Sequence, residues 1–285
     1  MTTIFLSVFF NSILLVILKL FAKYDINTLH ALVFNYLTAF VVGLLVNQTG
    51  FSPTEFIGQP WAIGCFLIGF LFISVFFITA KTAQANGIGV ASIASKMSLI
   101  IPILSGVIIF NESLNFYKII GILLALVAVF FATKKEGMTI SKDYFLYPIL
   151  VFIGAGIIDS SLNYFQVKLI PVEDTGLFSL ASFLMAFLAG VLILTVKTFT
   201  KPEKILGKSI LGGIVLGIPN YFSLYYLIKM LDHQTFNSAT IFTIHNVCIV
   251  IFTTLIGILF MKESLSKKNL LGLGLAVLAI IIVSM

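Results

Sequence analysis

Two charged side chains, Lys96 and Asp159, lie inside long apolar runs of the sequence. Charged groups are costly inside a membrane, and those that occur there usually pair with one another and mark the path of a substrate or an ion. If the two helices start on the same side of a membrane, the residues differ in depth by about 8 Å, much of which a lysine side chain can span. We therefore predict a cavity in which Lys96 binds an anionic group and Asp159 binds an amine, a hydroxyl or a proton. The alternative is a structural pair that locks the helices together.

Asp159 begins a polar stripe, because Asn163 and Gln166 follow it at spacings of four and seven residues. Residues at these spacings share one face of a helix. We expect this face to line the cavity. A polar seam between helices is the alternative.

The segment that follows Pro219 adds amide and aromatic groups, namely Asn220, Tyr221 and Tyr225. The two tyrosines are four residues apart and could stack on the ring of a ligand or hold a cation. Tyrosines nearer a helix end could equally belong to the aromatic belt at a membrane interface. Further candidate substrate-binding residues are polar and lie in other apolar runs: Ser92 and Ser95 beside Lys96, Asn246, Asn11 and Asn35. The amides among these could instead form hydrogen bonds between helices.

His245 lies in another apolar run, at an expected depth close to that of Asp159. Histidine titrates near neutral pH, so a proton relay between the two is one possible role. The alternative is a structural hydrogen bond between helices. The sequence contains no cluster with metal-ligand spacing, and we expect neither a metal nor a cofactor.

The helices that hold these residues are predicted from composition and hydropathy. The chain of 285 residues is 60% hydrophobic and only 10% charged, with a mean hydropathy of +1.14, which indicates an integral membrane protein. A membrane helix needs roughly 20 apolar residues, and continuous apolarity without alternation favours helices over a β-barrel. We therefore predict an all-α fold of ten transmembrane helices. The runs are Ile4–Lys19, Thr28–Val46, Trp61–Ala80, Ile88–Phe110, Phe116–Thr133, Phe145–Lys168, Thr175–Val196, Ile210–Leu231, Asn237–Phe260 and Asn269–Met285. Pro102 can kink the fourth run and free carbonyl groups for a ligand, or it only shapes packing.

The basic residues predict an orientation. All are lysines, and most fall in alternate connections between the runs. By the positive-inside rule the lysine-rich side is cytoplasmic, which places both termini outside. The net charge of +6 then reflects membrane orientation, and binding of nucleic acid is not expected.

The two halves of the sequence resemble each other. At a shift of 151 residues, FNESLNFYKIIGILLALVAV from Phe110 aligns with MKESLSKKNLLGLGLAVLAI from Met261, and a weaker match at 148 aligns the segments that end at Lys81 and Lys229. We predict two five-helix repeats, residues 1–135 and 144–285. Because five is odd, the second repeat enters the membrane inverted, as in alternating-access transporters. Lys96 aligns with Val247, so the buried lysine is not duplicated, which favours an asymmetric ligand.

The repeated Glu-Ser-Leu connection, at Glu112 and Glu263, and the glycine-bearing helix after it resemble the drug/metabolite transporter superfamily, specifically its EamA-type members. The resemblance covers nearly the whole chain and implies a ten-helix permease. Known members carry amino acids, other metabolites, nucleotide sugars or triose phosphates, so the substrate stays open. Many members look cytoplasmic at both ends, whereas the lysines here indicate the reverse. The two glutamates themselves are read as structural groups that the dipole of the helix they begin stabilises.

The function expected from these features is transport, with export as one direction, of a small polar metabolite such as an amino acid or similar zwitterion. A lipid-carrier flippase and a carrier of sugars or phosphorylated metabolites are the alternatives; the absence of arginine disfavours phosphate recognition. We expect no enzymatic activity. The expected partners are the substrate and membrane lipid, and we expect the protein to be a monomer or homodimer in a bacterial inner membrane.

Overall fold

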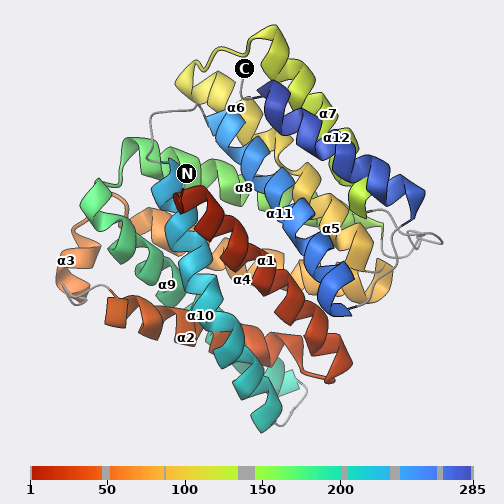
Figure 1. Ribbon diagram of the computed structural model, residues 1–285. Coiled ribbons are helices and arrows are strands. Elements are labelled where there is room, and N and C mark those ends of the chain that lie inside the picture. The colour runs from red at the N-terminus through yellow and green to blue at the C-terminus, as the bar shows by residue number, and fades with distance from the viewer. Residues whose placement is uncertain are drawn as a thin grey trace. The chain divides into compact units, whose positions relative to one another are not determined.

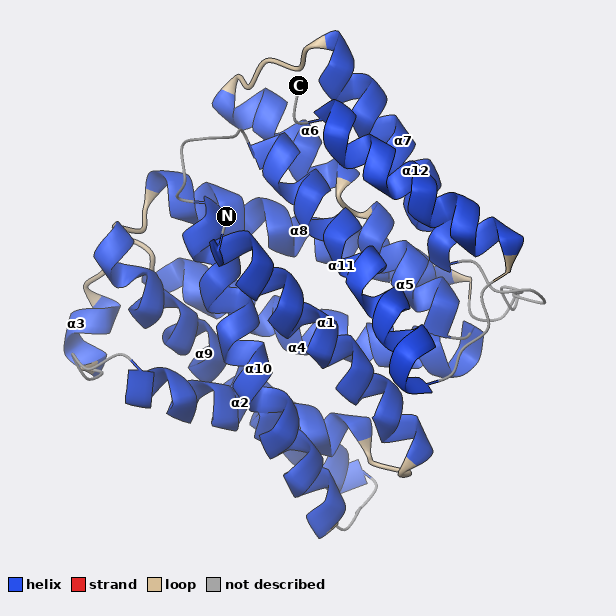
Figure 2. Ribbon diagram, in the orientation of Figure 1, coloured by secondary structure: helices blue, strands red, loops and turns tan. Residues whose placement is uncertain are grey.

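The computed structural model describes residues 2–46, 52–86, 88–133, 145–200, 205–231, 238–261 and 266–283, and every regular element in these ranges is helical (Figures 1 and 2). The α-helices are α1 (Thr2–Lys23), α2 (Thr28–Val46), α3 (Pro53–Ile57), α4 (Ala62–Asn86), α5 (Ile88–Met97), α6 (Ile100–Phe110), α7 (Phe116–Thr133), α8 (Leu146–Lys168), α9 (Thr175–Thr200), α10 (Gly207–Leu231), α11 (Ser238–Met261) and α12 (Lys267–Val283). A short 3-10 helix, η2 (Val172–Asp174), precedes α9.

Each predicted apolar run overlaps α-helix, which confirms the all-α class. One run, Ile88–Phe110, is not a single continuous helix, because it is divided into α5 and α6. Several helices extend beyond their runs; α4, for example, continues to Asn86. Hydropathy marks the part of a helix that lies in hydrocarbon, whereas the backbone hydrogen bonds continue into the polar region beyond it.

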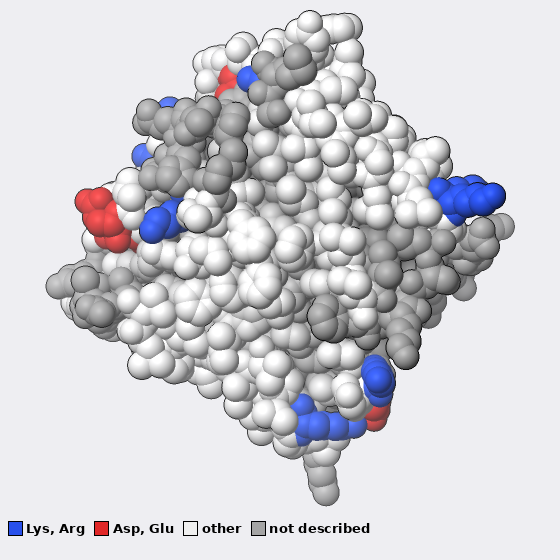
Figure 3. All heavy atoms as spheres, in the orientation of Figure 1, with Lys and Arg blue, Asp and Glu red and all other residues white. Residues whose placement is uncertain are grey.

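Within the residues that the structure describes, six helical segments are long and apolar enough to cross a membrane: Thr28–Val46, Ala62–Thr79, Ile93–Phe110, Leu146–Lys168, Val172–Lys197 and Gly207–Leu231. Shorter apolar helices cover Thr2–Leu18, Phe116–Phe131 and Ala239–Phe252. On the face seen in Figure 3, the middles of α1 and α10 carry no charged side chains, and charges gather near helix ends. The chain is therefore an integral, multi-pass membrane protein, while the count of ten spans stays a prediction.

The helices form two compact units, and each unit combines helices from both halves of the sequence. Unit 1 consists of Met1–Phe77 and Ser161–Asp232, and unit 2 of Ile78–Ser160 and His233–Met285. The predicted repeats, residues 1–135 and 144–285, divide the sequence in another way and remain a prediction about its internal similarity.

In unit 1, α2 packs between α9 and α10. It runs antiparallel to α9, because Gly43 lies against Leu180 and Gly190 lies against Val33. It runs parallel to α10, whose Gly217 touches the α2 backbone: a Cβ there would lie 2.6 Å from the Asn35 carbonyl oxygen. Small residues thus bring these helices to close backbone contact, as is common between membrane helices.

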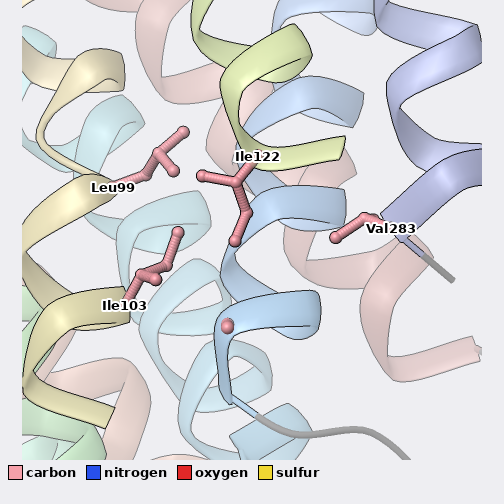
Figure 4. Close-up of a cluster of buried hydrophobic side chains, with 5 residues drawn as sticks. Leu99, Ile103, Ile122 and Val283 are labelled. Atoms are coloured by element: carbon pink, nitrogen blue, oxygen red, sulfur yellow. The ribbon is translucent and has the colours of Figure 1, made fainter. Parts of the chain in front are cut away.

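In unit 2, α7 and α12 lie side by side and antiparallel (Figure 1). Gly121 near the start of α7 contacts Val283 at the end of α12, and the Asn269 side chain donates a hydrogen bond to the Phe131 carbonyl, 3.0 Å away, at the opposite end of the pair. Figure 4 shows a buried cluster to which this pair contributes Ile122 and Val283, and in which Leu99 and Ile103 point toward Ile122 of α7.

Candidate functional site

The buried lysine predicted from sequence lies in the last turn of α5, and its side chain is 8% exposed. It interacts electrostatically with Asp159 of α8 and with His245 of α11, which is also buried. A cation is favourable at this end of α5, because the helix dipole is negative there. Unit 2 therefore brings together one residue from each of three helices. The structure places an electrostatic interaction of His245 with Lys96, and the proton relay between His245 and Asp159 stays a prediction.

The chain directly after Lys96 leaves the α-helical path at Ser98 and Leu99. Pro102 has no N–H group, so it cannot bond to the Ser98 carbonyl as an α-helix requires. That carbonyl instead accepts a hydrogen bond from the Ile101 N–H, 2.9 Å away, in a tighter turn. The helix therefore breaks where the sequence predicted a kink at Pro102. The Ser98 carbonyl that Pro102 leaves free is bonded by the Ile101 N–H.

The polar neighbours of these charges are engaged with helix backbone. The Ser98 hydroxyl donates to the Ser95 carbonyl at 2.6 Å, and Ser95 itself is half-buried. The Asn246 side chain donates to the Phe242 carbonyl of its own helix, at 3.0 Å. The side chain of Ser92 lies outside the described residues.

The amide and aromatic candidates gather in unit 1. The Asn220 side chain donates a hydrogen bond to the side-chain oxygen of Asn35, 3.0 Å away, and both residues are buried. The ring of Tyr221 stacks on that of Tyr225, with 5.9 Å between centroids. The Lys229 ammonium lies 5.6 Å from the Tyr225 centroid, so a cation of the chain itself occupies the face predicted for a ligand cation.

The part of the polar stripe that belongs to unit 1 is buried. Asn163 and Gln166 of α8 are both nearly inaccessible, as one shared helical face predicts. The Asn163 amide nitrogen and both polar atoms of the Gln166 side chain have no hydrogen-bond partner among the described residues. Asp159, in the part of α8 that belongs to unit 2, is half-buried. Asn11 of α1 is also half-buried.

The prediction that Glu112 begins a helix is wrong. This residue precedes α7, which begins at Phe116, and Asn115 accepts the capping hydrogen bond from the Lys118 N–H at 2.8 Å. The Glu112 carboxylate instead accepts a hydrogen bond from the Ala239 N–H at the start of α11, 3.4 Å away. The first turn of any helix has unpaired N–H groups, and here a residue distant in sequence supplies the acceptor. Glu263 lies outside the described residues.

Sequence reasoning missed three buried aromatic residues of unit 1 that pack against one another. Tyr36 of α2 and Phe72 of α4 both stack on the ring of Phe183 of α9, with centroid distances of 6.2 and 5.9 Å. The sequence contains 29 phenylalanines, so no local signal separates these rings from those that face lipid. Within the part of the chain that the structure describes, no group of His, Cys, Asp or Glu residues could hold a metal ion.

Comparison with known proteins adds three findings. Residues 146–285 match the EamA-like transporter family. An uncharacterized protein of Haemophilus influenzae is 34% identical over 274 residues, covering 93% of this chain and 91% of that protein. A solved crystal structure of another protein superposes with a TM-score of 0.71 over 98% of both chains, at 14% identity, so this likeness concerns the fold.

Proposed function

The chain belongs to the EamA-like transporter family, within the drug/metabolite transporter superfamily. From its buried charges we infer that it carries an amino acid or a similar small zwitterion across the membrane. The transporter class follows from the family. The substrate and the mechanism are the proposal.

The observation that carries the proposal is the group of Lys96, Asp159 and His245 in unit 2. A buried ammonium group can bind the carboxylate of a zwitterion, and a carboxylate can bind its ammonium group. When no substrate is bound, Lys96 and Asp159 offset each other's charge, which lowers the cost of keeping both inside the membrane. A phosphorylated substrate fits less well, because the chain contains no arginine to provide a bidentate contact.

The packing of unit 1 supports alternating access by two inverted repeats. The shift of 148 residues found in the sequence relates Gly69 to Gly217 and Thr38 to Ala186. Gly217 packs against the Thr38 side chain, and Gly69 packs against the Met185 side chain and the Ala186 backbone nitrogen. The α2–α9 pair, whose members correspond under this shift, is antiparallel, as inversion requires. In unit 2 the α7–α12 pair, whose members correspond under the shift of 151, is antiparallel too.

The proposed topology has ten spans, arranged as repeats over residues 1–135 and 144–285, in a bacterial inner membrane. The lysine-rich connections support a cytoplasmic location for their side and an outside location for both termini. In this arrangement the substrate site lies near the middle of the membrane, where inverted-repeat transporters bind their substrates.

Counterflow in proteoliposomes tests the proposal. Vesicles that contain the purified protein are loaded with a mixture of unlabelled amino acids, and uptake of each labelled amino acid is measured. We expect accumulation by the wild type and its loss in Lys96→Met and Asp159→Asn. Lys267→Met and Asp25→Asn, which remove exposed charges at helix ends, are the matched controls and should transport normally.

Equal accumulation by all variants would make the buried charges structural and remove the basis for a zwitterion. If no variant accumulates amino acids, the same vesicles are assayed for movement of labelled lipid between leaflets. A positive result there would replace the proposal with the lipid-carrier function.

A further inference from the structure

The segment that carries Lys96 is divided into two helices, whereas its counterpart in the other half of the sequence is one. The shift of 151 residues relates the span of α5 and α6 to α11, which is continuous from Ser238 to Met261. The same shift relates Pro102 to Thr253, which has the backbone N–H group that proline lacks. An apolar segment of this length therefore does not need a break, and the break occurs in the half that contains the buried lysine.

The two helices on either side of the break pack against different neighbours in unit 2. α5 lies against α7, and α6 lies against α11 (Figure 1). The start of α6 is also held to α8, because a Cβ on Gly156 would lie only 2.6 Å from the Ile101 Cβ. Leu99, in the break itself, is fully buried and points toward Ile122 of α7 (Figure 4). Close contacts with α7 and α8 thus anchor the break and the start of α6.

The packing of α5 itself is light. Half of its sequence, IGVASIASKM, is Gly, Ala or Ser, and the buried ones among its described side chains are Ala91, Ala94 and Lys96. An alanine side chain buries one methyl group and contributes little apolar area. The Leu99 N–H reaches the Lys96 carbonyl oxygen only at 3.5 Å, beyond the usual limit of about 3.2 Å. Segments with few buried apolar contacts move at a lower free-energy cost than the rest of a fold.

The electrostatic interaction between Lys96 and Asp159 links α5 to the anchored helices. Lys96 is in the last turn of α5, directly before the break. Asp159 follows Gly156 by three residues on α8, so it lies on the face of α8 that meets α6. Coulombic attraction is strong away from water, and here it acts on a helix with few apolar contacts. A ligand that binds either charge competes with this attraction.

We propose that α5 is a movable half-helix, which turns about Ser98 and Leu99 and is held near α8 by the attraction of Lys96 to Asp159. A substrate carboxylate that binds Lys96, or a substrate ammonium group that binds Asp159, releases α5 and couples binding to a change of shape. Discontinuous helices commonly form the substrate site of inverted-repeat transporters. The inference rests on the proposed transport function and adds the step by which the substrate acts on the protein.

Distances between pairs of nitroxide spin labels, measured by pulsed electron resonance on the full-length protein in lipid nanodiscs, test this proposal without a substrate. Cys65 and Cys248 are first replaced by alanine, so that labels attach only to introduced cysteines. Labels at half-buried Ile93 and exposed Ile153 report the distance between α5 and α8. Labels at exposed Leu104 and Ile153 report the distance between α6 and α8.

Asp159→Asn and Lys96→Met each remove the attraction, and we expect both to lengthen or broaden the Ile93–Ile153 distance. Ile93 precedes Ser98 by five residues, roughly 8 Å along a helix, so a rotation of about 20° moves it by about 3 Å. The distance between the α6 and α8 labels should not change. Lys96→Met leaves no buried lysine without its partner, so it carries the test if Asp159→Asn does not fold.

Two further variants complete the test. Asp25→Asn, the matched control, neutralises an exposed carboxylate and should leave both distances unchanged. Pro102→Thr supplies the N–H group found at the corresponding position of α11, so the helix can continue through the break. Combined with Asp159→Asn, it should suppress the change in the Ile93–Ile153 distance.

Unchanged distances in the variants that remove either buried charge would overturn the proposal. An equal change in both label pairs would overturn it too, because the broken segment would then move as one body. These results are independent of the counterflow assay. A distance change in variants that still transport amino acids would keep the movable half-helix and reject the charges as the substrate site. Loss of counterflow without a distance change would keep that site and reject the movable half-helix.

Discussion

The close contacts of Gly69 and Gly217 make a quantitative prediction about the corresponding helix pairs. A Cβ on Gly217 would lie 2.5 Å from the Thr38 Cβ and 2.6 Å from the Asn35 carbonyl oxygen. A Cβ on Gly69 would lie 2.5 Å from the Met185 Cβ and 2.6 Å from a backbone nitrogen of α9. Since backbone atoms cannot rotate away as side chains do, each pair of helices must separate by roughly 0.8 Å to restore ordinary contact.

We expect Gly69→Ala and Gly217→Ala each to lower the free energy of unfolding by about 2 kcal/mol, within the range of about 1–3 kcal/mol that overpacking costs. For a chain of this size the melting temperature should fall by about 4–8 °C. The two values should agree if the two contacts correspond under the predicted repeat. Thermal unfolding of each variant in the same detergent, followed by circular dichroism at 222 nm, measures the change.

Gly274→Ala is the matched control, because nothing lies within 4 Å of the added Cβ. Alanine also favours a helix over glycine, so this variant should be as stable as the wild type or more so. If Gly69→Ala and Gly217→Ala melt like Gly274→Ala, the helices are not in backbone contact and the packing argument fails. A large effect at one position alone would argue against the correspondence of the two helix pairs.

Three further predictions concern single side chains, each measured as the melting temperature in detergent. Leu99→Ala removes a fully buried side chain from the core of unit 2 and should lower the free energy of unfolding by about 2–5 kcal/mol. The control Leu104→Ala, at an exposed position, should lower it much less, and equal losses would place Leu99 outside the core. Glu112→Ala removes an acceptor at the start of α11 and should cost about 1 kcal/mol, so an unchanged melting temperature would mean that the cap is not formed. Lys208→Met breaks the 3.0 Å ion pair with the exposed Asp25. The melting temperature should not change measurably, because solvent screens such pairs, and a large drop would mean that this ion pair stabilises the fold.

The sequence alone determined the helices and the charges that stand out among them. A backbone in hydrocarbon must satisfy its own hydrogen bonds, so continuous apolar runs predict where helices lie, although α4 extends past its run to Asn86 and one run is divided into α5 and α6. Lys96 and Asp159 were found because charged residues are rare inside such runs. The self-similarity of the chain also indicated which helices correspond, since shifts of 148 and 151 residues are visible in the letters themselves.

Only the tertiary structure decided which residues meet. His245 lies near Lys96, and Glu112 caps α11, because helices distant in sequence pack together. The hydropathy of the sequence does not indicate which helices become neighbours. Rings at Tyr36 and Phe183 are as apolar as rings that face lipid. Their burial depends on which face of each helix turns inward, and in a membrane both faces can be equally hydrophobic. The stacking of Tyr36 on Phe183 and the hydrogen bond between Asn220 and Asn35 therefore appear only when the helices are assembled.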